Sequence, residues 1–585
     1  MQHAAFRFSA VDAALPAVAL LSVLPRLTQL GRSLWNDETF ATHLRLGFNR
    51  GTLAWMAYDT HPPLYSLLML LWTRAFGDSE RSIRMFPLLC SVASVLLIGK
   101  VAASLLGRGG GLLAAAALAL SGASVFYAQE ARSYSFLVTV LLLMTWFLVR
   151  YWRDGRPRDL RGFFVCAVVG GLTHVYALLF VTLFLVLLAL TVPRDAGAGP
   201  QVLRLALAGV ALAVPTYFLI ALMILFTGEH SYLWRGITSE FGGREAAALI
   251  SFYLFGHGGL TGKPLVGLAA CALFLGGVYA AWRRSSERPS GREPSAHDYR
   301  LPEARWLFAT AVAFGVVLVL AAVAAPVWLT PEALGRLVGP NRHPELLAAL
   351  PPLLRRTGLL YLAAYAGLAA AWGLLSGRHG ARLGRAFDGA RARLGLPAPT
   401  PGRVITGFPL FAVALVLFIS RFRPTYNNRY MTALMPFVVI GVSAAVWRSM
   451  ASRATRAALA AALLAAQAYS LTRQEEAYAL LKPDYRGALK YLGGTEAARY
   501  PITGTAQWEL ENLSRYYADR GEIGRLKIVT RSEALGEERV AVIVPQAYPL
   551  EAPHLAELRE LVRSGTTTTV RFPGLTVYEV SRGAH

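Results

Sequence analysis

The sequence has few charged residues and few cysteines for its length. Of its 585 residues, 16% are Asp, Glu, Lys or Arg, whereas 55% are hydrophobic. A typical soluble domain carries about 25% charged residues, and a disordered chain has low hydrophobicity. These shortages exclude an ordinary soluble enzyme and a disordered protein. The cysteines Cys90, Cys166 and Cys271 lie in apolar runs without a CxxC pair, so we expect small membrane-helix residues there.

The sequence also lacks the motifs of nucleotide and metal chemistry. It contains no P-loop, no GxGxxG, no HExxH and no EF-hand pattern. With no ATP site, the energy for any synthetic reaction must arrive in an activated donor. The net charge of +23 is high, but the basic residues cluster in short loops between apolar runs and accompany no nucleic-acid motif. We therefore expect no nucleic-acid partner.

Apolar runs make up most of the chain up to residue 472, and a bilayer span needs about 20 such residues. The predicted spans are 11–30, 83–106, 110–127, 134–151, 203–226, 264–282, 305–329, 357–375, 404–420, 430–447 and 456–471. Residues 162–192 are long enough for two short helices, with a break near Thr173 and His174. We predict that residues 1–472 form an all-α polytopic membrane bundle with about 13 transmembrane helices.

Basic loops give the orientation of the bundle, because short loops rich in Lys and Arg stay in the cytoplasm. The basic loops are 150–161, 283–305, 378–403 and 448–456. Placing all of them inside puts the first long loop, 31–82, on the outer side. Residues 62–76 and 245–255 then have both flanks outside and are short for a span. We predict that they form interfacial or re-entrant helices.

The composition changes after residue 472, and residues 473–585 are more polar. The predicted strands there are 500–505, 525–530, 539–545 and 569–580, and the helical patterns are 485–492 and 554–562. About 110 residues are enough to bury a core. We expect a small α/β domain, which the topology places outside the cytoplasm.

Two polar clusters of the first outer loop are candidates for function. The first is the pair Asp37 and Glu38, which follows the first span. Two adjacent acids fit a solvated loop, a helix N-terminus that favours negative charge, or a catalytic carboxylate. The second cluster contains His61 and Tyr65, separated by prolines that suit a helix start. His61 fits a hydrogen-bonding group in a cavity or a metal ligand.

Two further clusters lie in later outer loops. Glu130 and Arg132 occupy a very short turn between two predicted spans. They can pair with each other or with lipid headgroups, or Arg132 can face a cavity and bind an anion, since its fork geometry suits phosphate. The last cluster, residues 421–430, contains three arginines on the side where the positive-inside rule expects few. That departure favours an anion site.

Together, these clusters place carboxylates, arginines and aromatic residues on the outer face of a helical bundle. This set suits a phosphate-linked substrate that is carried by a lipid. A site outside the cytoplasm meets no cytoplasmic sugar nucleotide, and the chain has no ATP site. A sugar linked to a polyprenyl phosphate satisfies both constraints.

At this point the ordered motifs resemble those of bacterial glycosyltransferase family 39, which has the membrane GT-C fold and includes relatives of protein mannosyltransferases and of the aminoarabinose transferase. The similarity is densest over residues 30–190. The matching pieces are Asp37-Glu38, His61-Pro62-Pro63-Leu64-Tyr65, Phe76-Gly77-Asp78-Ser79-Glu80, Arg84-Met85-Phe86-Pro87, Gln129-Glu130-Ala131-Arg132-Ser133-Tyr134, Thr173-His174, Arg429-Tyr430 and Lys482-Pro483-Asp484-Tyr485-Arg486-Gly487.

The resemblance implies transfer of a sugar from a polyprenyl-phosphate donor, with inversion and with Asp37 as general base. A phosphate leaving group is stable as an anion, so the general acid of glycoside hydrolysis can be dispensed with. A base for the acceptor hydroxyl and cations for the phosphate remain necessary. We assign Asp37 and Glu38 to catalysis, with Asp37 as the base. The predicted substrate-binding residues are His61, Tyr65, Glu130, Arg132, Tyr134, His174, Arg429 and Tyr430, of which Arg132 and Arg429 bind the phosphate.

Several questions stay open at this point. Some members of the family use a metal, but no clear ligand set is present here, so a divalent metal is left undecided. His61 stands where the aminoarabinose branch has Lys, and the C-terminal domain is unlike the MIR domain of eukaryotic protein mannosyltransferases. The sugar is therefore undetermined, and the acceptor can be a lipid, a glycan or a protein. We expect a multi-pass protein of the bacterial cytoplasmic membrane.

Two other functions fit part of the pattern. An oligosaccharyltransferase or polymer ligase would share the donor type but transfer a whole glycan. A flippase or transporter for lipid-linked sugars would explain the helices and the outer arginines. It would not need the carboxylate pair in a long surface loop, and we find no internal repeat of the kind that transporters have.

Overall fold

The structure is a computed structural model of the whole chain. It describes residues 10–38, 62, 64–154, 156–174, 176, 177, 180, 243–258, 260, 261, 263–284, 401–420, 429–448, 452–546, 549–552, 555–582 and isolated positions between 363 and 393. Predictions for His61, for spans 203–226 and 305–329, for most of 357–375 and for loop 421–428 lie outside the described residues.

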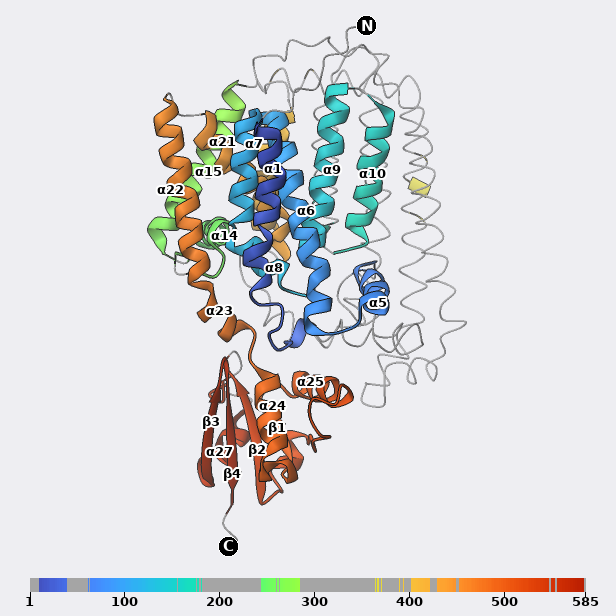
Figure 1. Cartoon of the computed structure of the whole chain (residues 1–585), viewed down its shortest axis with the longest axis vertical. Coiled ribbons are helices and arrows are strands. Elements are labelled where there is room, and N and C mark those ends of the chain that lie inside the picture. Colours follow the sequence, from blue (N-terminus) through green and yellow to red (C-terminus); the bar gives the residue numbers. More distant parts are fainter. Residues whose placement is uncertain are drawn as a thin grey trace.

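The N-terminal part of the chain is a bundle of helices (Figure 1). Its described members include α1 (Ala10–Leu21), α2 (Val23–Leu27), α6 (Glu80–Leu106), α7 (Arg108–Ala119), α8 (Gly122–Ala128), α9 (Tyr134–Asp154), α10 (Pro157–Gly171), α15 (Pro264–Arg284), α20 (Pro401–Ser420), α21 (Met435–Arg448) and α22 (Arg453–Thr472). Buried Ala, Leu, Val and Phe side chains of these helices form one apolar core. The helices begin and end where local chemistry requires: Ser79 caps α6, and Gly107 ends it with a positive φ of 83°.

The described residues contain three helices that are long and apolar enough to cross a membrane. They are α6, the first part of α9 over Tyr134–Tyr151, and the continuous segment Tyr430–Arg448. The bent pair α7 and α8 would make a fourth. These helices support a membrane protein, whereas the predicted number of about 13 spans is not confirmed.

The predicted single span 110–127 differs from the structure. It is two helices, α7 and α8, which meet at an angle of 57°. The break falls at Ser121, whose side chain accepts a hydrogen bond from the Ser124 N–H and so starts a new helix. This N-cap ends the continuity that the apolar pattern alone suggested.

Two helices run across the bundle instead of along it. Figure 1 shows α5 (Leu64–Phe76) and α14 (Gly243–Phe255) nearly end-on, beside helices that are seen from the side. Both correspond to segments for which the sequence predicts interfacial or re-entrant helices. α5 lies near the end of the bundle that faces the C-terminal domain.

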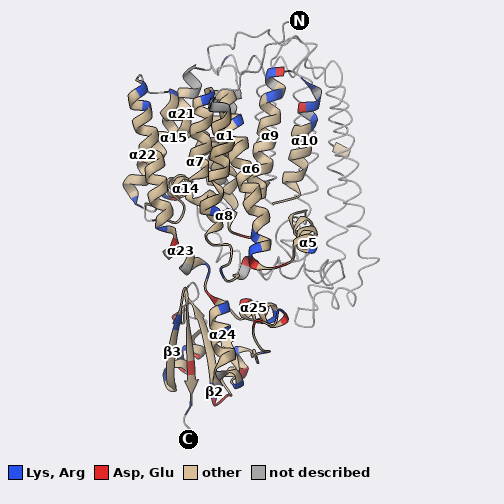
Figure 2. Ribbon diagram, viewed as in Figure 1, with Lys and Arg blue, Asp and Glu red and all other residues tan. Residues whose placement is uncertain are grey.

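The charged residues are unevenly distributed over the bundle. Figure 2 shows Lys and Arg at the ends of α9, α10 and α22 that point away from the C-terminal domain. These ends adjoin the predicted cytoplasmic loops 150–161 and 448–456. The described basic loops and the C-terminal domain therefore lie at opposite ends of the molecule, as the positive-inside argument expects.

The C-terminal domain is a four-stranded sheet with helices. It contains α23 (Gln474–Leu481), α24 (Tyr485–Gly494), β1 (Ile502–Gly504), α25 (Gln507–Asp519), α26 (Arg531–Ala534), β2 (Arg539–Pro545), α27 (Ala556–Ser564), β3 (Thr566–Phe572) and β4 (Leu575–Ser581). The strand order is β1-β2-β4-β3, with β1 and β2 parallel and the other pairs antiparallel.

Two of the predicted strands differ from this sheet. Residues 525–530 contribute only an isolated bridge between Ile528 and Ile502. The run 569–580 is a hairpin of two strands, because Gly574 adopts a positive φ of 74° and turns the chain back. Tyr485 and Leu489 of α24 belong to the same buried cluster as Leu34 and Met69, so apolar packing joins the domain to the bundle.

Candidate functional site

The adjacent acids of the first outer loop lie in a short 3-10 helix, η1 (Asn36–Glu38), and only Glu38 is fully buried. Arg84 of α6 binds both carboxylate oxygens of Glu38, with Nε–Oε1 at 2.8 Å and Nη2–Oε2 at 2.5 Å. The Ala131 N–H donates a third hydrogen bond to Glu38, at 2.9 Å. These contacts engage both oxygens of Glu38.

The charge state of Glu38 follows from the same contacts. Burial by itself would raise the pKa of this carboxyl, but the charges of Arg84 and Lys482 and the hydrogen bonds outweigh burial and hold the pKa below its usual value. Glu38 is thus an anion whose charge is matched by buried cations. This geometry favours a role in holding the loop over a role in proton transfer.

Asp37 has different surroundings from its neighbour. Its side chain is 27% exposed, and its Oδ2 accepts a hydrogen bond from Arg429 Nη1 at 2.5 Å. The guanidinium of Arg429 also lies over the Trp35 ring, 4.4 Å from its centroid. Arg132 Nη1 lies 3.5 Å from the backbone oxygen of Asp37. An accessible carboxylate is therefore placed beside two arginines that come from distant parts of the chain.

Arg429 is held in its charged form. Burial opposes the charge, but Asp37 and Glu130 outweigh burial and raise the pKa of the guanidinium. A permanently charged, planar fork suits bidentate binding of a phosphate. The same guanidinium that now contacts Asp37 can therefore serve an anionic ligand.

Aromatic side chains lie beside the polar group that Asp37, Arg132 and Arg429 form. The His174 ring lies 5.8 Å from Tyr134 and 5.5 Å from Tyr430, centroid to centroid. Tyr176 lies 5.2 Å from Tyr430, and its N–H donates to His174 Nδ1 at 3.1 Å. Tyr430 directly follows Arg429 in the chain, and Tyr134 follows Arg132 by two residues. The structure thus brings together three predicted aromatic site residues next to the predicted arginines.

Glu130 forms a buried pair with a residue of the C-terminal segment. Lys482 Nζ lies 3.7 Å from Glu130 Oε2 and donates to the backbone oxygen of Gln129 at 3.0 Å. The ammonium also lies 4.7 Å from the centroid of the Phe126 ring. Burial raises the pKa of Glu130 and lowers that of Lys482. Burial therefore weakens the preference of both groups for their charged forms.

Tyr65, on α5, packs against Phe86, at 6.0 Å, and Phe136, at 6.3 Å, between ring centroids. It belongs to the same buried cluster as Leu34 and Ala131, which flank the acids and the turn that contains Glu130. Its predicted role in substrate binding stays a prediction, as does that of His61, which lies outside the described residues. Within the part of the chain that the structure describes, no group of three or more His, Cys, Asp or Glu side chains could hold a metal ion.

Sequence reasoning missed Trp35, Arg84 and Lys482 as members of this group. Arg84 and Lys482 were noted as parts of matching motifs, but their partners lie far away in the chain, at Glu38 and Glu130. One signal in the sequence could have pointed to Arg84. A charge inside an apolar helix such as α6 is energetically unfavourable unless it has a partner. The identity of that partner required the fold.

Comparisons with known proteins agree with the motifs. Residues 60–220 match the sequence model of the family described as dolichyl-phosphate-mannose-protein mannosyltransferase. This match confirms the resemblance for that segment, which contains Arg84, Glu130, Arg132, Tyr134 and His174. No curated protein matches the chain significantly.

Among solved structures, ArnT from Cupriavidus metallidurans is similar to the chain, both in the apo state, at 14% identity, and bound to undecaprenyl phosphate, at 13% identity. Both alignments cover 98% of each chain, with a TM-score of 0.42. The oligosaccharyltransferase of Archaeoglobus fulgidus in complex with zinc and sulfate is similar at 11% identity, over 97% of this chain and 72% of that chain, with a TM-score of 0.41. These similarities are distant.

Proposed function

We propose that the protein is a membrane glycosyltransferase that moves a single sugar from a polyprenyl-phosphate donor to an acceptor hydroxyl outside the cytoplasm, with inversion. The family that matches residues 60–220 is named for a sugar carried by a polyprenyl phosphate. The proposal rests on the difference in burial and in partners between Asp37 and Glu38. Glu38 is buried and fully paired, whereas Asp37 is accessible beside Arg429 and Arg132.

The proposed reaction uses one carboxylate and two cations. Asp37 takes the proton of the acceptor hydroxyl while the acceptor oxygen forms a bond to the anomeric carbon of the sugar. The bond between that carbon and the phosphate oxygen breaks, and its electron pair leaves with the polyprenyl phosphate. Arg429 and Arg132 stabilise the negative charge that grows on the phosphate. No protonation of the leaving group is required, because the phosphate is already a stable anion.

The ion pair between Asp37 and Arg429 would make donor binding affect the base as well as the phosphate site. Arg429 Nη1 lies 2.5 Å from Asp37 Oδ2. A bound phosphate competes for the same guanidinium, and a bidentate arginine–phosphate contact is a strong charge-assisted interaction. Donor binding would thus draw Arg429 from Asp37 and leave the carboxylate able to accept a proton.

The position of the site fits a lipid-borne donor. Residues 33 and 34, just before Asp37, contact the C-terminal domain, whereas the basic ends of α9, α10 and α22 point away from that domain (Figure 2). If the basic ends face the cytoplasm, the site faces the outer side of the cytoplasmic membrane of a bacterium. A polyprenyl chain can stay in the bilayer there while its phosphate reaches the arginines.

Product analysis tests the proposal. Purified full-length protein would be incubated with polyprenyl-phosphate-linked mannose, glucose and arabinose and with a crude membrane fraction as acceptor. Free polyprenyl phosphate and the mass gained by the acceptor would be measured. We expect release from one donor and a gain of one sugar. Transfer of a whole glycan from an oligosaccharide donor would indicate a ligase instead. Movement of lipid-linked sugar across vesicles without release would indicate a flippase.

A further inference from the structure

The segment that carries Asp37 has little structure of its own. Between α2 and η1, residues 33–35 form neither helix nor strand, and η1 itself is a single 3-10 turn. A 3-10 turn of three residues gains little from its own hydrogen bonds. The position of Asp37 therefore depends on what holds the preceding residues in place.

From the side of the bundle, Arg84 holds this segment. Besides Glu38, its guanidinium donates to the backbone oxygens of Leu30, Arg32 and Ser33, at 3.0, 2.7 and 3.0 Å. The guanidinium is fully buried, so each of these contacts replaces water. One face of the segment is thus fixed to α6.

From the opposite side, the C-terminal domain holds the same segment. The Tyr517 hydroxyl of α25 accepts a hydrogen bond from the Leu34 N–H at 3.0 Å and lies 3.2 Å from Ser33 Oγ. Tyr517 is fully buried. Burial and the nearby Glu80 raise the pKa of Tyr517, so the hydroxyl keeps its proton. Leu34 lies only three residues before Asp37.

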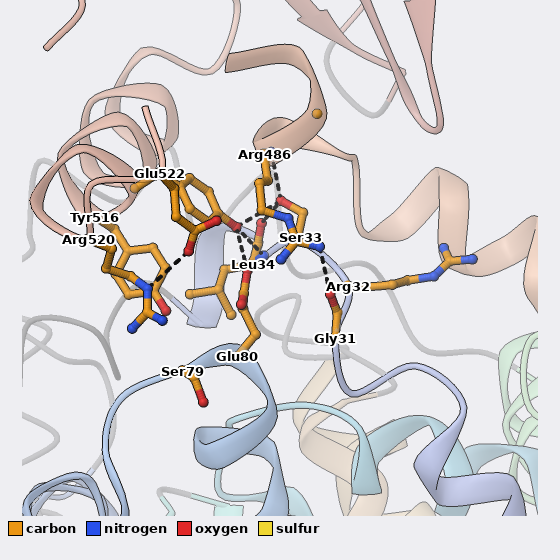
Figure 3. A network of polar contacts seen from close by, with 12 residues as sticks. Gly31, Arg32, Ser33, Leu34, Ser79, Glu80, Arg486, Tyr516, Arg520 and Glu522 are labelled. Atoms are coloured by element: carbon orange, nitrogen blue, oxygen red, sulfur yellow. Dashed lines mark hydrogen bonds and ion pairs between the residues drawn. The ribbon is translucent and has the colours of Figure 1, made fainter. Parts of the chain in front are cut away.

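A second residue of the domain, Arg486 of α24, completes the contact. Its backbone N–H donates to Ser33 Oγ at 3.1 Å, and its guanidinium donates to the Gly31 oxygen at 2.8 Å and to Glu80 at 2.9 Å. Figure 3 shows residues 31–34 beside the pair of Arg486 and Glu80, which lies at the start of α6. Residues 31–34 are therefore held by hydrogen bonds both to α6 and to the C-terminal domain.

We propose that Tyr517 and Arg486 are positioning residues of the transfer reaction, through which the C-terminal domain fixes residues 31–34 and thereby the place of Asp37. The inference rests on the proposed function of Asp37. It assigns to the C-terminal domain a part in positioning the proposed catalytic carboxylate. A displacement of about 1 Å in a reacting group can lower a rate by about 10²-fold.

The same interface offers matched controls. Tyr516 neighbours Tyr517 on α25 and donates its hydroxyl to the Asp78 backbone oxygen at 2.9 Å. Arg520 pairs with the Asp78 carboxylate at 2.8 Å. The polar contacts of both residues with the bundle go to Asp78, in the loop between α5 and α6, and not to residues 31–34. Loss of their side-chain groups weakens docking without acting on Asp37.

The test compares Tyr517→Phe and Arg486→Gln with Tyr516→Phe and Arg520→Gln in the full-length protein. The first readout is the steady-state release of polyprenyl phosphate. We expect kcat to fall about 10-fold to 10²-fold in Tyr517→Phe and Arg486→Gln, with the donor KM nearly unchanged, and both controls to keep the wild-type kcat. The second readout is hydrogen exchange of peptides that contain Leu34, which we expect to speed up only in Tyr517→Phe and Arg486→Gln.

Each outcome decides the inference. Unchanged kcat in Tyr517→Phe and Arg486→Gln, or an equal fall in their controls, would overturn it. If the wild-type protein releases polyprenyl phosphate from no donor, the proposed function fails, and the inference about the reaction fails with it. Hydrogen exchange then still reports on the contact itself: faster exchange near Leu34 in Tyr517→Phe but not in Tyr516→Phe shows that the domain orders the segment independently of any reaction.

Discussion

Asp37 and Glu38 are neighbours in the chain, and the fold gives their carboxylates different surroundings. Glu38 balances the buried charge of Arg84 and organises the carbonyl groups around it. Asp37 keeps contact with solvent and with an arginine that can change partners. Loss of each carboxylate should therefore have a different consequence.

Glu38→Gln should mainly destabilise the protein. The change leaves the Arg84 guanidinium buried without its counter-ion, which typically costs about 3–5 kcal/mol. Asp37→Asn removes the charge from a part-buried pair whose side chains are 24% and 27% exposed and leaves Arg429 the nearby charge of Glu130, so we expect a smaller cost, about 1 kcal/mol. Thermal unfolding of both variants in the same detergent checks the difference. Equal loss of stability in the two variants would contradict the assignment of separate roles.

Arg429→Gln should impair the use of the donor. The change removes a fixed cation from the proposed phosphate site, and loss of one such contact costs about 10²-fold to 10³-fold in rate. Arg132→Ala should act in the same direction. Arg150→Gln is the control, because Arg150 pairs with Asp159 at the opposite end of the bundle. Wild-type donor kinetics in both Arg429→Gln and Arg132→Ala would remove these residues from the phosphate site.

Residue types and the family resemblance together predicted Asp37, Arg132, Tyr134, His174, Arg429 and Tyr430 as site residues, and the structure places these near one another. Residue types alone could not separate Asp37 from Glu38. The difference depends on Arg84, which is 46 residues from Glu38 in the chain and reaches it only through the fold.

At the scale of elements, close helix packing depends on glycine. α15 and α21 pack together at Gly277, where an added Cβ would lie 1.7 Å from the Gly441 backbone oxygen. At the neighbouring Gly276, an added Cβ would meet no atom within 4 Å. Backbone cannot move aside as a flexible side chain can, so the two glycines should differ in their tolerance of substitution.

Gly277→Ala should therefore force α15 and α21 apart and destabilise the bundle by about 1–3 kcal/mol. Gly276→Ala should be neutral or slightly stabilising, because alanine is the better helix former. The midpoint of thermal unfolding in detergent compares the two. Equal midpoints would show that this helix contact does not contribute to stability.

His257, in the turn after α14, should make the free energy of unfolding depend on pH. His257 lies between the rings of Phe126, at 4.7 Å, and Phe252, at 4.8 Å. Burial, together with the charges of Arg429 and Lys482, lowers the pKa of His257 from 6.5 to about 4. The unfolded chain binds a proton near pH 6.5 and the native state does not, so stability falls as the pH drops from 6.5 to about 4.

His257→Phe keeps a ring of similar shape and cannot take up a proton. The variant should lose less stability than the wild type between pH 7 and pH 5, by on the order of 1 kcal/mol. Thermal unfolding of both proteins at the two pH values gives the comparison. Parallel losses would mean that His257 is protonated equally in the folded and unfolded states.

Element boundaries were predictable where apolar runs coincide with capping residues. The run 83–106 agrees with α6, and the run 134–151 agrees with the part of α9 that is apolar enough to cross a membrane. The bend at Ser121 and the hairpin at Gly574 were not predicted, because each depends on one residue inside a continuous run. Apolar periodicity averages over such single positions.

At the scale of the whole molecule, two ends of a membrane bundle are distinguished by their chemistry. The described basic loops lie at one end (Figure 2), and residues 33 and 34, just before Asp37, contact the C-terminal domain at the other. Charge patterning predicted this arrangement from the sequence, because it depends on composition along the chain. The contact of Tyr517 and Arg486 with residues 31–34 was not predictable, since it joins segments more than 450 residues apart.

The most direct measurement of the central claim is the release of polyprenyl phosphate by wild-type protein, by Asp37→Asn and by Asp154→Asn. Asp154 is the control, because it pairs with Arg153 at the end of α9 away from the site. We predict a fall of about 10²-fold to 10⁴-fold in kcat for Asp37→Asn, with folding and membrane insertion retained, and wild-type release by Asp154→Asn. Wild-type release by Asp37→Asn would contradict the assignment of Asp37 as the base.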